Sequence, residues 1–207
     1  MIGCDTEFFQ SREDSLTILE RLSELNKDIS VITKLSLPKD FIQKLKEIDF
    51  NLNQHNNFLA FSESITCIDS AGEWEPGAPN PESRIETIRM VHTAGIKTMI
   101  AIRPLLPTLS SEELEKIVSL TKDYCDGYYS GPLYLKSLDH PILDKESLAS
   151  LKIEKLQPHW MPEGNIFYKI EKDGQMDFLR NKAQESGRPF FEGAADGIKY
   201  IKRHEKH

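Results

Sequence analysis

The sequence has few cysteines, and none of them lie close together. Cys4, Cys67 and Cys125 are each separated by more than 50 residues. Zinc and iron–sulfur sites usually draw on close pairs of the form Cys-x2-Cys, and a disulfide framework needs an even set of cysteines. We therefore interpret the three cysteines as buried thiols and assign no metal ligand in this chain.

Long apolar runs and basic clusters are also missing. No run reaches the roughly 20 apolar residues of a membrane-spanning helix, and residues 1–25 lack the charged-then-apolar order of a signal peptide. The net charge is −7 without a dense Lys/Arg cluster, which argues against a sequence-independent grip on nucleic acid. The composition thus predicts a cytoplasmic protein with neither a membrane nor a nucleic-acid partner.

The sequence does contain an alternation of short β-branched runs and amphipathic helical stretches, which favours parallel βα units. Strands are expected at residues 1–6, 29–33, 58–62, 98–102 and 127–129. Helices are expected at 13–25 and after Pro38, Pro81 and Ser110. Four full units plus one strand fall short of the eight in a complete barrel. The predicted fold class is therefore α/β, a partial parallel (β/α) barrel of the TIM-like type.

The alternation weakens after Leu135. Further strands are expected at 152–156, 166–170 and 189–191, and further helices at 176–186 and 194–203. We accordingly divide the chain into a partial barrel, residues 1–135, and an α+β C-terminal extension, residues 136–207. The extension is expected to complete or cap the barrel.

Three places at expected strand ends carry residues suited to ligand binding, because reactive groups in such barrels gather at the carboxyl ends of the strands. The first comprises Asp5, Thr6 and Glu7. A carboxylate there suits a cationic amino group, to which it accepts a charge-assisted hydrogen bond. The alternative is that these residues simply cap the strand.

The second place comprises Ser62, Glu63 and Ser64. Small hydroxyls beside a carboxylate suit ribose, since each sugar hydroxyl both donates and accepts a hydrogen bond. A turn or a helix cap is the alternative interpretation.

The third place is the apolar strand that ends in Arg103 and Leu105. An unpaired buried cation is costly, so Arg103 is expected either to pair with a carboxylate at the strand mouth or to meet an anionic ligand. Leu105 and its apolar neighbours suit the floor of an adenine pocket, although a core strand needs the same residue types.

Three motifs give the chain a family resemblance over roughly residues 2–135. They are Ile32-Thr33-Lys34, the segment from Glu75-Pro76 through Arg84 to Gly95, and Arg103-Pro-Leu-Leu-Pro107. With these motifs the chain resembles the radical S-adenosylmethionine (SAM) superfamily, in particular its spore photoproduct lyase-like branch.

The resemblance implies a barrel whose first strand is followed by a Cys-x3-Cys-x2-Cys loop that holds a 4Fe–4S cluster, to which SAM binds. This chain aligns from the family's second strand onward, so the first βα unit and the cluster ligands are missing from it. On this alignment residues 4–7 lie where relatives contact the methionine amino group of SAM. Ser62, Glu63 and Ser64 correspond to the ribose contact, and Leu105 lies near the adenine.

The leading interpretation is an N-terminally truncated radical SAM-type protein, inactive alone, from a family that cleaves SAM reductively. One alternative is half of a split radical SAM enzyme, in which a second polypeptide supplies the missing first strand. Another is a non-catalytic module for nucleoside binding or protein interaction. The last is an unrelated, metal-independent α/β enzyme that uses Glu7, Glu63 and Arg103 as acid, base and anion clamp.

Overall fold

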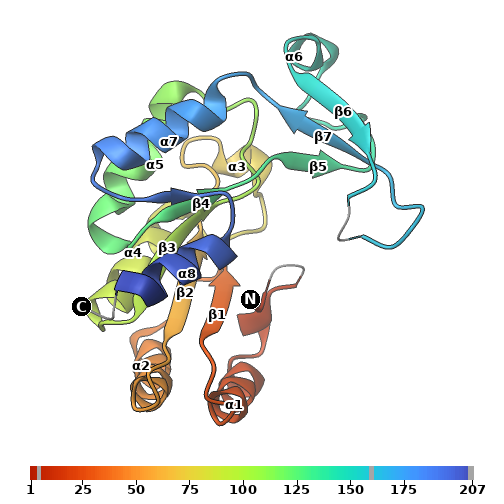
Figure 1. Cartoon of the computed structure of the whole chain (residues 1–207). Coiled ribbons are helices and arrows are strands. Elements are labelled where there is room, and N and C mark those ends of the chain that lie inside the picture. Colours follow the sequence, from red (N-terminus) through yellow and green to blue (C-terminus); the bar gives the residue numbers. More distant parts are fainter. Residues whose placement is uncertain (4–5, 159–160, 205–207) are drawn as a thin grey trace.

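The computed structural model describes residues 1–3, 6–158 and 161–204. Its frame consists of a five-stranded parallel sheet in the order β1-β2-β3-β4-β8 and a three-stranded antiparallel sheet in the order β5-β7-β6 (Figure 1). The strands are β1 (Ile29–Thr33), β2 (Leu59–Ser64), β3 (Lys97–Ile102), β4 (Tyr128–Ser130), β5 (Leu133–Leu135), β6 (Lys152–Leu156), β7 (Phe167–Glu171) and β8 (Phe190–Phe191). The predicted α/β class with a parallel sheet is confirmed.

Eight α-helices lie within the described residues: α1 (Arg12–Ser23), α2 (Lys39–Asn53), α3 (Ala71–Trp74), α4 (Pro81–Thr93), α5 (Ser111–Thr121), α6 (Lys145–Ala149), α7 (Gln175–Glu185) and α8 (Ala194–His204). Two short 3-10 helices, η1 (Phe8–Gln10) and η2 (Lys122–Tyr124), complete this part of the chain. None of these helices is long and apolar enough to cross a membrane.

Local sequence signals set the helix ends. Asn80 caps α4 by accepting a backbone hydrogen bond from its first turn, and Pro81 takes the first helical position, where a missing N–H costs nothing. Gly95 follows α4 with a φ of 88°, a left-handed conformation that glycine adopts without strain. Ser110 caps α5 by accepting from the backbone N–H of Glu113, as the Ser-x-x-Glu pattern predicts.

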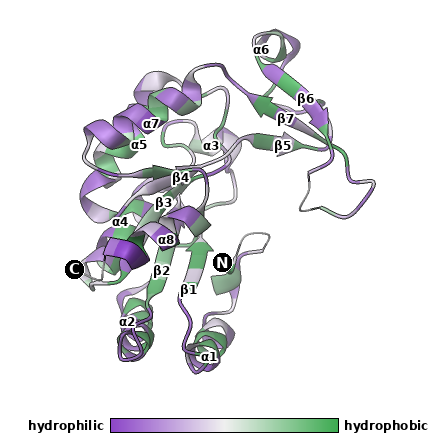
Figure 2. Cartoon of the chain, in the orientation of Figure 1, coloured by the Kyte–Doolittle hydropathy of each residue, from purple (hydrophilic) through white to green (hydrophobic). Residues whose placement is uncertain are grey.

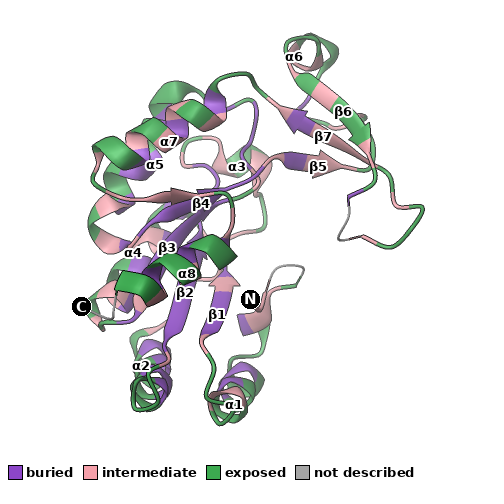
Figure 3. Cartoon of the chain, in the orientation of Figure 1, coloured by how far each residue is buried: buried purple, intermediate pink, exposed green. Residues whose placement is uncertain are grey.

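The parallel sheet separates two cores. We call the face covered by α8 the inner face; in Figure 1, α8 crosses in front of β2 and β3. Its core consists of Phe58, Ala60, Met99, Ala101, Tyr129, Ala194 and Ile201. The outer face packs against a layer of helices that includes α2, α4 and α5, and it holds the largest core cluster. With both faces covered, the strands of this sheet are largely hydrophobic and buried (Figures 2 and 3).

Within residues 1–3, the expected first strand pairs with the sheet at one position. Ile2 forms an isolated parallel bridge with Val31 of β1, and Gly3 follows with a φ of 93°. Cys4 and Asp5 lie outside the described residues. The edge of β1 is therefore paired at a single position within the described part of the chain.

The C-terminal extension returns to the parallel sheet. The two residues of β8 pair in parallel with β4, while β5 pairs with β7 in the smaller sheet. Strand pairing therefore crosses position 135 twice, and the boundary at this position remains a prediction. Neither β5 nor α6 was expected from the sequence.

Candidate functional site

The carboxyl ends of β1, β2 and β3 bring together most of the residues predicted to bind a ligand. The strand β2 extends two residues further than expected, because Ser64 still pairs with Ala101 of β3. Side chains alternate between the two faces of a strand. Ser62 and Ser64 therefore share the inner face, whereas Glu63 lies on the outer face.

The two serines are buried polar groups without an internal partner. Ser62 has no exposed surface and Ser64 is 2% exposed, and neither hydroxyl forms a hydrogen bond within the described residues. Buried hydroxyls in folded proteins are normally satisfied, and those left unpaired require a physical account. Two such hydroxyls lie at neighbouring inner-face positions at the end of β2. They suit a ligand that both donates and accepts hydrogen bonds, such as a ribose diol.

Glu63 belongs to a different environment from its serine neighbours. It is fully buried, and neither carboxylate oxygen has a hydrogen-bond partner among the described residues. Burial raises the pKa of Glu63 well above its usual value; the nearby Arg84 opposes this, and Glu7 and Glu75 reinforce it. The structure therefore does not bring Glu63 to the same surface as Ser62 and Ser64.

A buried ionic network anchors the loop that follows β2. Arg84 of α4 contacts Glu75 at 2.6 Å and donates a hydrogen bond to the Ser64 carbonyl at 2.9 Å. Glu75 also accepts from Lys34 at 2.5 Å and from the Thr66 hydroxyl at 2.7 Å. Burial on its own raises the pKa of Glu75, but Lys34, Thr66 and Arg84 together hold it below its usual value. The loop is thus tied to the ends of β1 and β2.

The Glu7 carboxylate accepts hydrogen bonds from several neighbouring residues. Its carboxylate accepts from the Phe9 backbone at 3.1 Å, the Thr33 hydroxyl at 2.8 Å and the Lys34 backbone at 3.1 Å. Thr6 is exposed beside it. Of about four acceptor positions on a carboxylate, three are used, so one remains for a ligand.

Arg103 lies just beyond the end of β3 and is exposed, not buried within the strand as the sequence suggested. It forms no ion pair with a carboxylate among the described residues. Leu105 is buried, and its backbone N–H donates to the Gly131 carbonyl at 2.7 Å. Arg103 was expected either to pair with a carboxylate or to meet an anionic ligand. The described residues do not provide the carboxylate.

A cavity of about 180 Å³, which was not expected from the sequence, lies at these strand ends. Trp74 and His140 stack with ring centroids 5.3 Å apart at its wall. The remaining lining residues are Lys34, Thr66, Glu75, Pro104, Leu106, Leu133 and Leu135. They come from segments up to about 100 residues apart, so no local pattern marks them.

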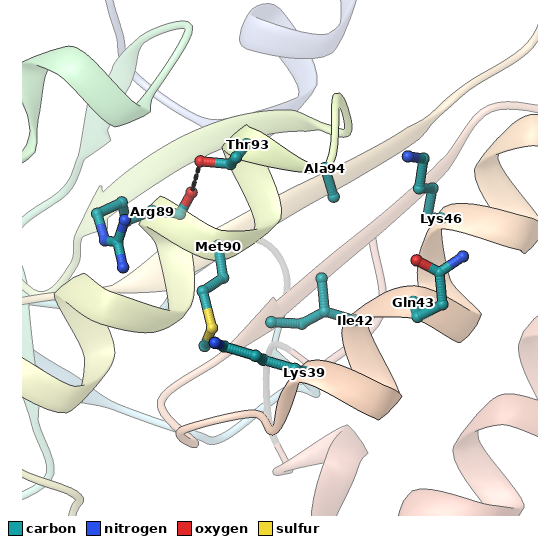
Figure 4. Close-up of a pocket in the computed structure, with 8 residues that line it drawn as sticks. All are labelled: Lys39, Ile42, Gln43, Lys46, Arg89, Met90, Thr93 and Ala94. Atoms are coloured by element: carbon teal, nitrogen blue, oxygen red, sulfur yellow. Dashed lines mark hydrogen bonds between the residues drawn. The ribbon is translucent and has the colours of Figure 1, made fainter.

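A second hollow, of about 330 Å³, lies between α2 and α4 (Figure 4). Its walls are formed by Lys39, Ile42, Gln43, Lys46, Arg89, Met90, Thr93 and Ala94. All of these residues belong to the two helices or follow α4 directly, so this groove lies in the outer helical layer. It is separate from the strand ends, where (β/α) barrels place their ligands.

The described residues do not fit a 4Fe–4S cluster. The described part of the chain has no group of three His, Cys, Asp or Glu side chains that could hold a metal ion. Cys67 and Cys125 are buried free thiols, as predicted, and burial raises their pKa values to about 11 and about 12. Because the thiolate is the form that binds metal, these two cysteines are poor ligands.

Comparison with solved structures shows the fold. A spore photoproduct lyase mutant with bound AdoMet and dinucleoside spore photoproduct superposes with a TM-score of 0.63 over 91% of this chain and 59% of that chain, at 13% identity. A domain of pyruvate-formate lyase-activating enzyme from Bacteroides vulgatus gives 0.61 over 92% and 96%, at 14% identity. This chain has a radical SAM-like fold.

Sequence comparison is less informative than the fold. No protein-family model matches the chain. An uncharacterized protein of Methanocaldococcus jannaschii is 28% identical over 113 residues, which is 53% of this chain. The chain spans 39% of the length of that relative. The radical SAM-like fold agrees with the family resemblance of the motifs around Glu75, Arg84 and Arg103.

Proposed function

We propose that this chain binds SAM at the carboxyl ends of β1, β2 and β3, as the cofactor-binding part of a radical SAM-type protein. One observation carries the proposal: Ser62 and Ser64 present two buried, unpaired hydroxyls on the inner face at the strand ends. A neighbour with the same fold holds AdoMet, which supports a nucleoside ligand at such a sheet.

The predicted contacts divide among the parts of SAM. Ser62 and Ser64 face the ribose, and Leu105 with its apolar neighbours faces the adenine. Thr6 and Glu7 face the amino group, for which Glu7 keeps one acceptor position beside its contacts with described residues. Asp5, predicted together with them, lies outside the described residues. Glu63 was predicted to contact the ribose together with the two serines. It lies on the opposite face of the sheet and is not proposed as a direct contact. In its superfamily, SAM supplies a 5′-deoxyadenosyl radical.

We propose that the chain is inactive in radical chemistry on its own, since the described residues do not fit the cluster. A polypeptide that supplies the first strand and cysteine loop would join the sheet beside the N-terminal segment, where Ile2 already bridges Val31 of β1 in parallel. A nucleoside-binding module without catalysis is the alternative. We further propose a cytoplasmic protein with no membrane and no nucleic-acid partner.

The metal-independent enzyme is the least supported alternative. Glu63 lies on the outer face, whereas Arg103 continues the inner-face register of β3. Glu7 is engaged by three internal hydrogen bonds. An acid, a base and an anion clamp must converge on one substrate, and these three side chains do not.

Titration of the purified chain with SAM in a calorimeter tests the proposal. The double variant Ser62→Ala with Ser64→Ala is expected to weaken SAM binding by roughly tenfold or more, because two hydrogen bonds to the ligand are lost. Ser30→Ala is the matched control, since Ser30 is also a buried, unpaired hydroxyl but lies near the amino end of β1. Equal affinity in all three proteins would refute the ribose contact.

A further inference from the structure

Arg103 is an exposed cation at the centre of the sheet's carboxyl edge. It directly follows β3, the middle strand in the order β1-β2-β3-β4-β8. Within the described residues its guanidinium has neither an ion-pair partner nor a hydrogen bond. An unpaired guanidinium at the mouth of a sheet retains all five of its N–H donors for a ligand.

Two glycines provide the space in which this side chain lies. A Cβ atom on Gly131, which follows β4, would lie 3.1 Å from Nε and 3.3 Å from Cζ of Arg103. A Cβ atom on Gly193, which follows β8, would lie 4.0 Å from Nη1. The side chain therefore extends from β3 toward β4 and β8, and packing against Gly131 fixes its direction.

The smaller sheet brings further polar groups to this position. Tyr134 of β5 is opposite Lys169 of β7, which pairs with Glu171 at 2.6 Å. Burial raises the pKa of Tyr134, while Lys169 and Arg103 both act to lower it. The phenol is thus within electrostatic range of both cations, and β5 begins two residues after Gly131, the glycine beside the guanidinium.

We propose that Arg103, in the space beside Gly131 and Gly193, forms an anion site that takes a carboxylate or phosphate group of the substrate. A guanidinium receives either group through two parallel hydrogen bonds, and this geometry favours arginine over lysine. The inference rests on the proposed function, because it treats the strand ends as the place where SAM and a second molecule meet.

The order of the strands separates this site from the carboxylate of SAM itself. In the proposed orientation the amino group of SAM lies beside Glu7 at the β1 side of the sheet, and the carboxylate is attached to the same carbon atom. Arg103 extends in the other direction, toward β4 and β8. Its anion therefore belongs to a different molecule.

Calorimetric titrations with inorganic phosphate, acetate, SAM and 5′-deoxyadenosine test the assignment on the full chain. Arg103→Gln is expected to weaken phosphate or acetate binding by roughly tenfold or more and to leave SAM affinity unchanged. Gly131→Ala, which displaces the guanidinium, is expected to act in the same direction. Arg12→Gln, at an exposed arginine of α1, and Gly77→Ala, with nothing within 4 Å of its Cβ, are the controls.

Two results would overturn the anion site. One is that neither anion binds the original chain. The other is that Arg103→Gln weakens SAM but not 5′-deoxyadenosine, which lacks the carboxylate; Arg103 would then hold the carboxylate of SAM. A third result separates the two proposals. If anion binding depends on Arg103 but the chain does not bind SAM, the proposed function is refuted and the anion site remains.

Discussion

At the scale of single residues, the most consequential feature is a buried ionic cluster on the outer face of β2. Glu63, Glu75 and Arg84 lie together there, and Arg84 has no exposed surface. Glu75 accepts hydrogen bonds from Lys34 and Thr66 and forms an ion pair with Arg84, whereas the Glu63 carboxylate has no hydrogen-bond partner among the described residues. The two carboxyl groups therefore have opposite pKa shifts, and their substitutions are expected to have opposite effects on stability.

Glu63→Gln is expected to make the protein more stable at neutral pH. The folded-state pKa of Glu63 is raised above its usual value of 4.5, chiefly by burial. Above pH 4.5 the unfolded chain releases this proton while the folded chain retains it. The free energy of unfolding of the original protein therefore falls as the pH rises toward the raised pKa. The advantage of the variant is expected to grow as the pH rises from 4.5 toward the raised pKa and to vanish below pH 4.5. Urea unfolding across this range measures it, and a variant less stable throughout would refute the account.

Arg84→Gln is expected to lower the free energy of unfolding by about 3–5 kcal/mol, because it leaves the buried Glu75 without its arginine. Arg89→Gln is the matched control, five residues along α4, since Arg89 pairs with Glu86 on the exposed surface. The free energy of unfolding of Arg89→Gln is expected to be close to that of the original chain. Equal unfolding midpoints for the two variants would show that the buried pair contributes no more than the exposed one.

At the scale of elements, the short strand β8 shows what local patterns do not reveal. Two residues, Phe190 and Phe191, join the parallel sheet about 60 residues after β4. The sequence predicted a strand here, but a run this short does not specify its partner. By contrast, β1 matches the expected residues 29–33, α4 begins at Pro81 as predicted, and α5 begins after its predicted cap Ser110, because these signals are local.

Gly127→Ala tests whether close packing between β4 and β8 stabilises the fold. A Cβ atom at this position would lie 2.8 Å from the Phe191 ring and 3.1 Å from the Pro189 carbonyl oxygen. Since backbone must move to relieve the contact, the variant is expected to lose about 1–3 kcal/mol of stability. Thermal unfolding measures the loss against Gly77→Ala, whose Cβ meets nothing within 4 Å. Equal melting temperatures would indicate that β8 adapts freely.

The candidate site was only partly predictable from the sequence, for a similar reason. Ser62, Ser64 and Arg103 follow expected strands, so their position at the strand ends could be predicted. The burial of Glu63 on the outer face depends on β2 extending to Ser64. The partnership of Lys34 with Glu75 spans 41 residues and arises only when β1 and β2 lie side by side.

At the scale of the whole molecule, the chain combines a radical SAM-like fold with residues that do not fit a 4Fe–4S cluster. Its fold superposes on that of a spore photoproduct lyase mutant over 91% of this chain and 59% of that chain, although the two sequences are 13% identical. The described residues provide no group of three metal ligands. We therefore expect the nucleoside site and the cluster site to be separable in this protein.

The most direct test is to incubate the chain anaerobically with iron and sulfide and then to measure both cluster absorption and SAM binding. The account predicts that SAM binds and that no stoichiometric 4Fe–4S cluster forms. Absence of SAM binding would contradict the nucleoside site. A stoichiometric cluster would contradict the separation of the two sites, and its ligands would have to be sought among Cys4, Cys67 and Cys125.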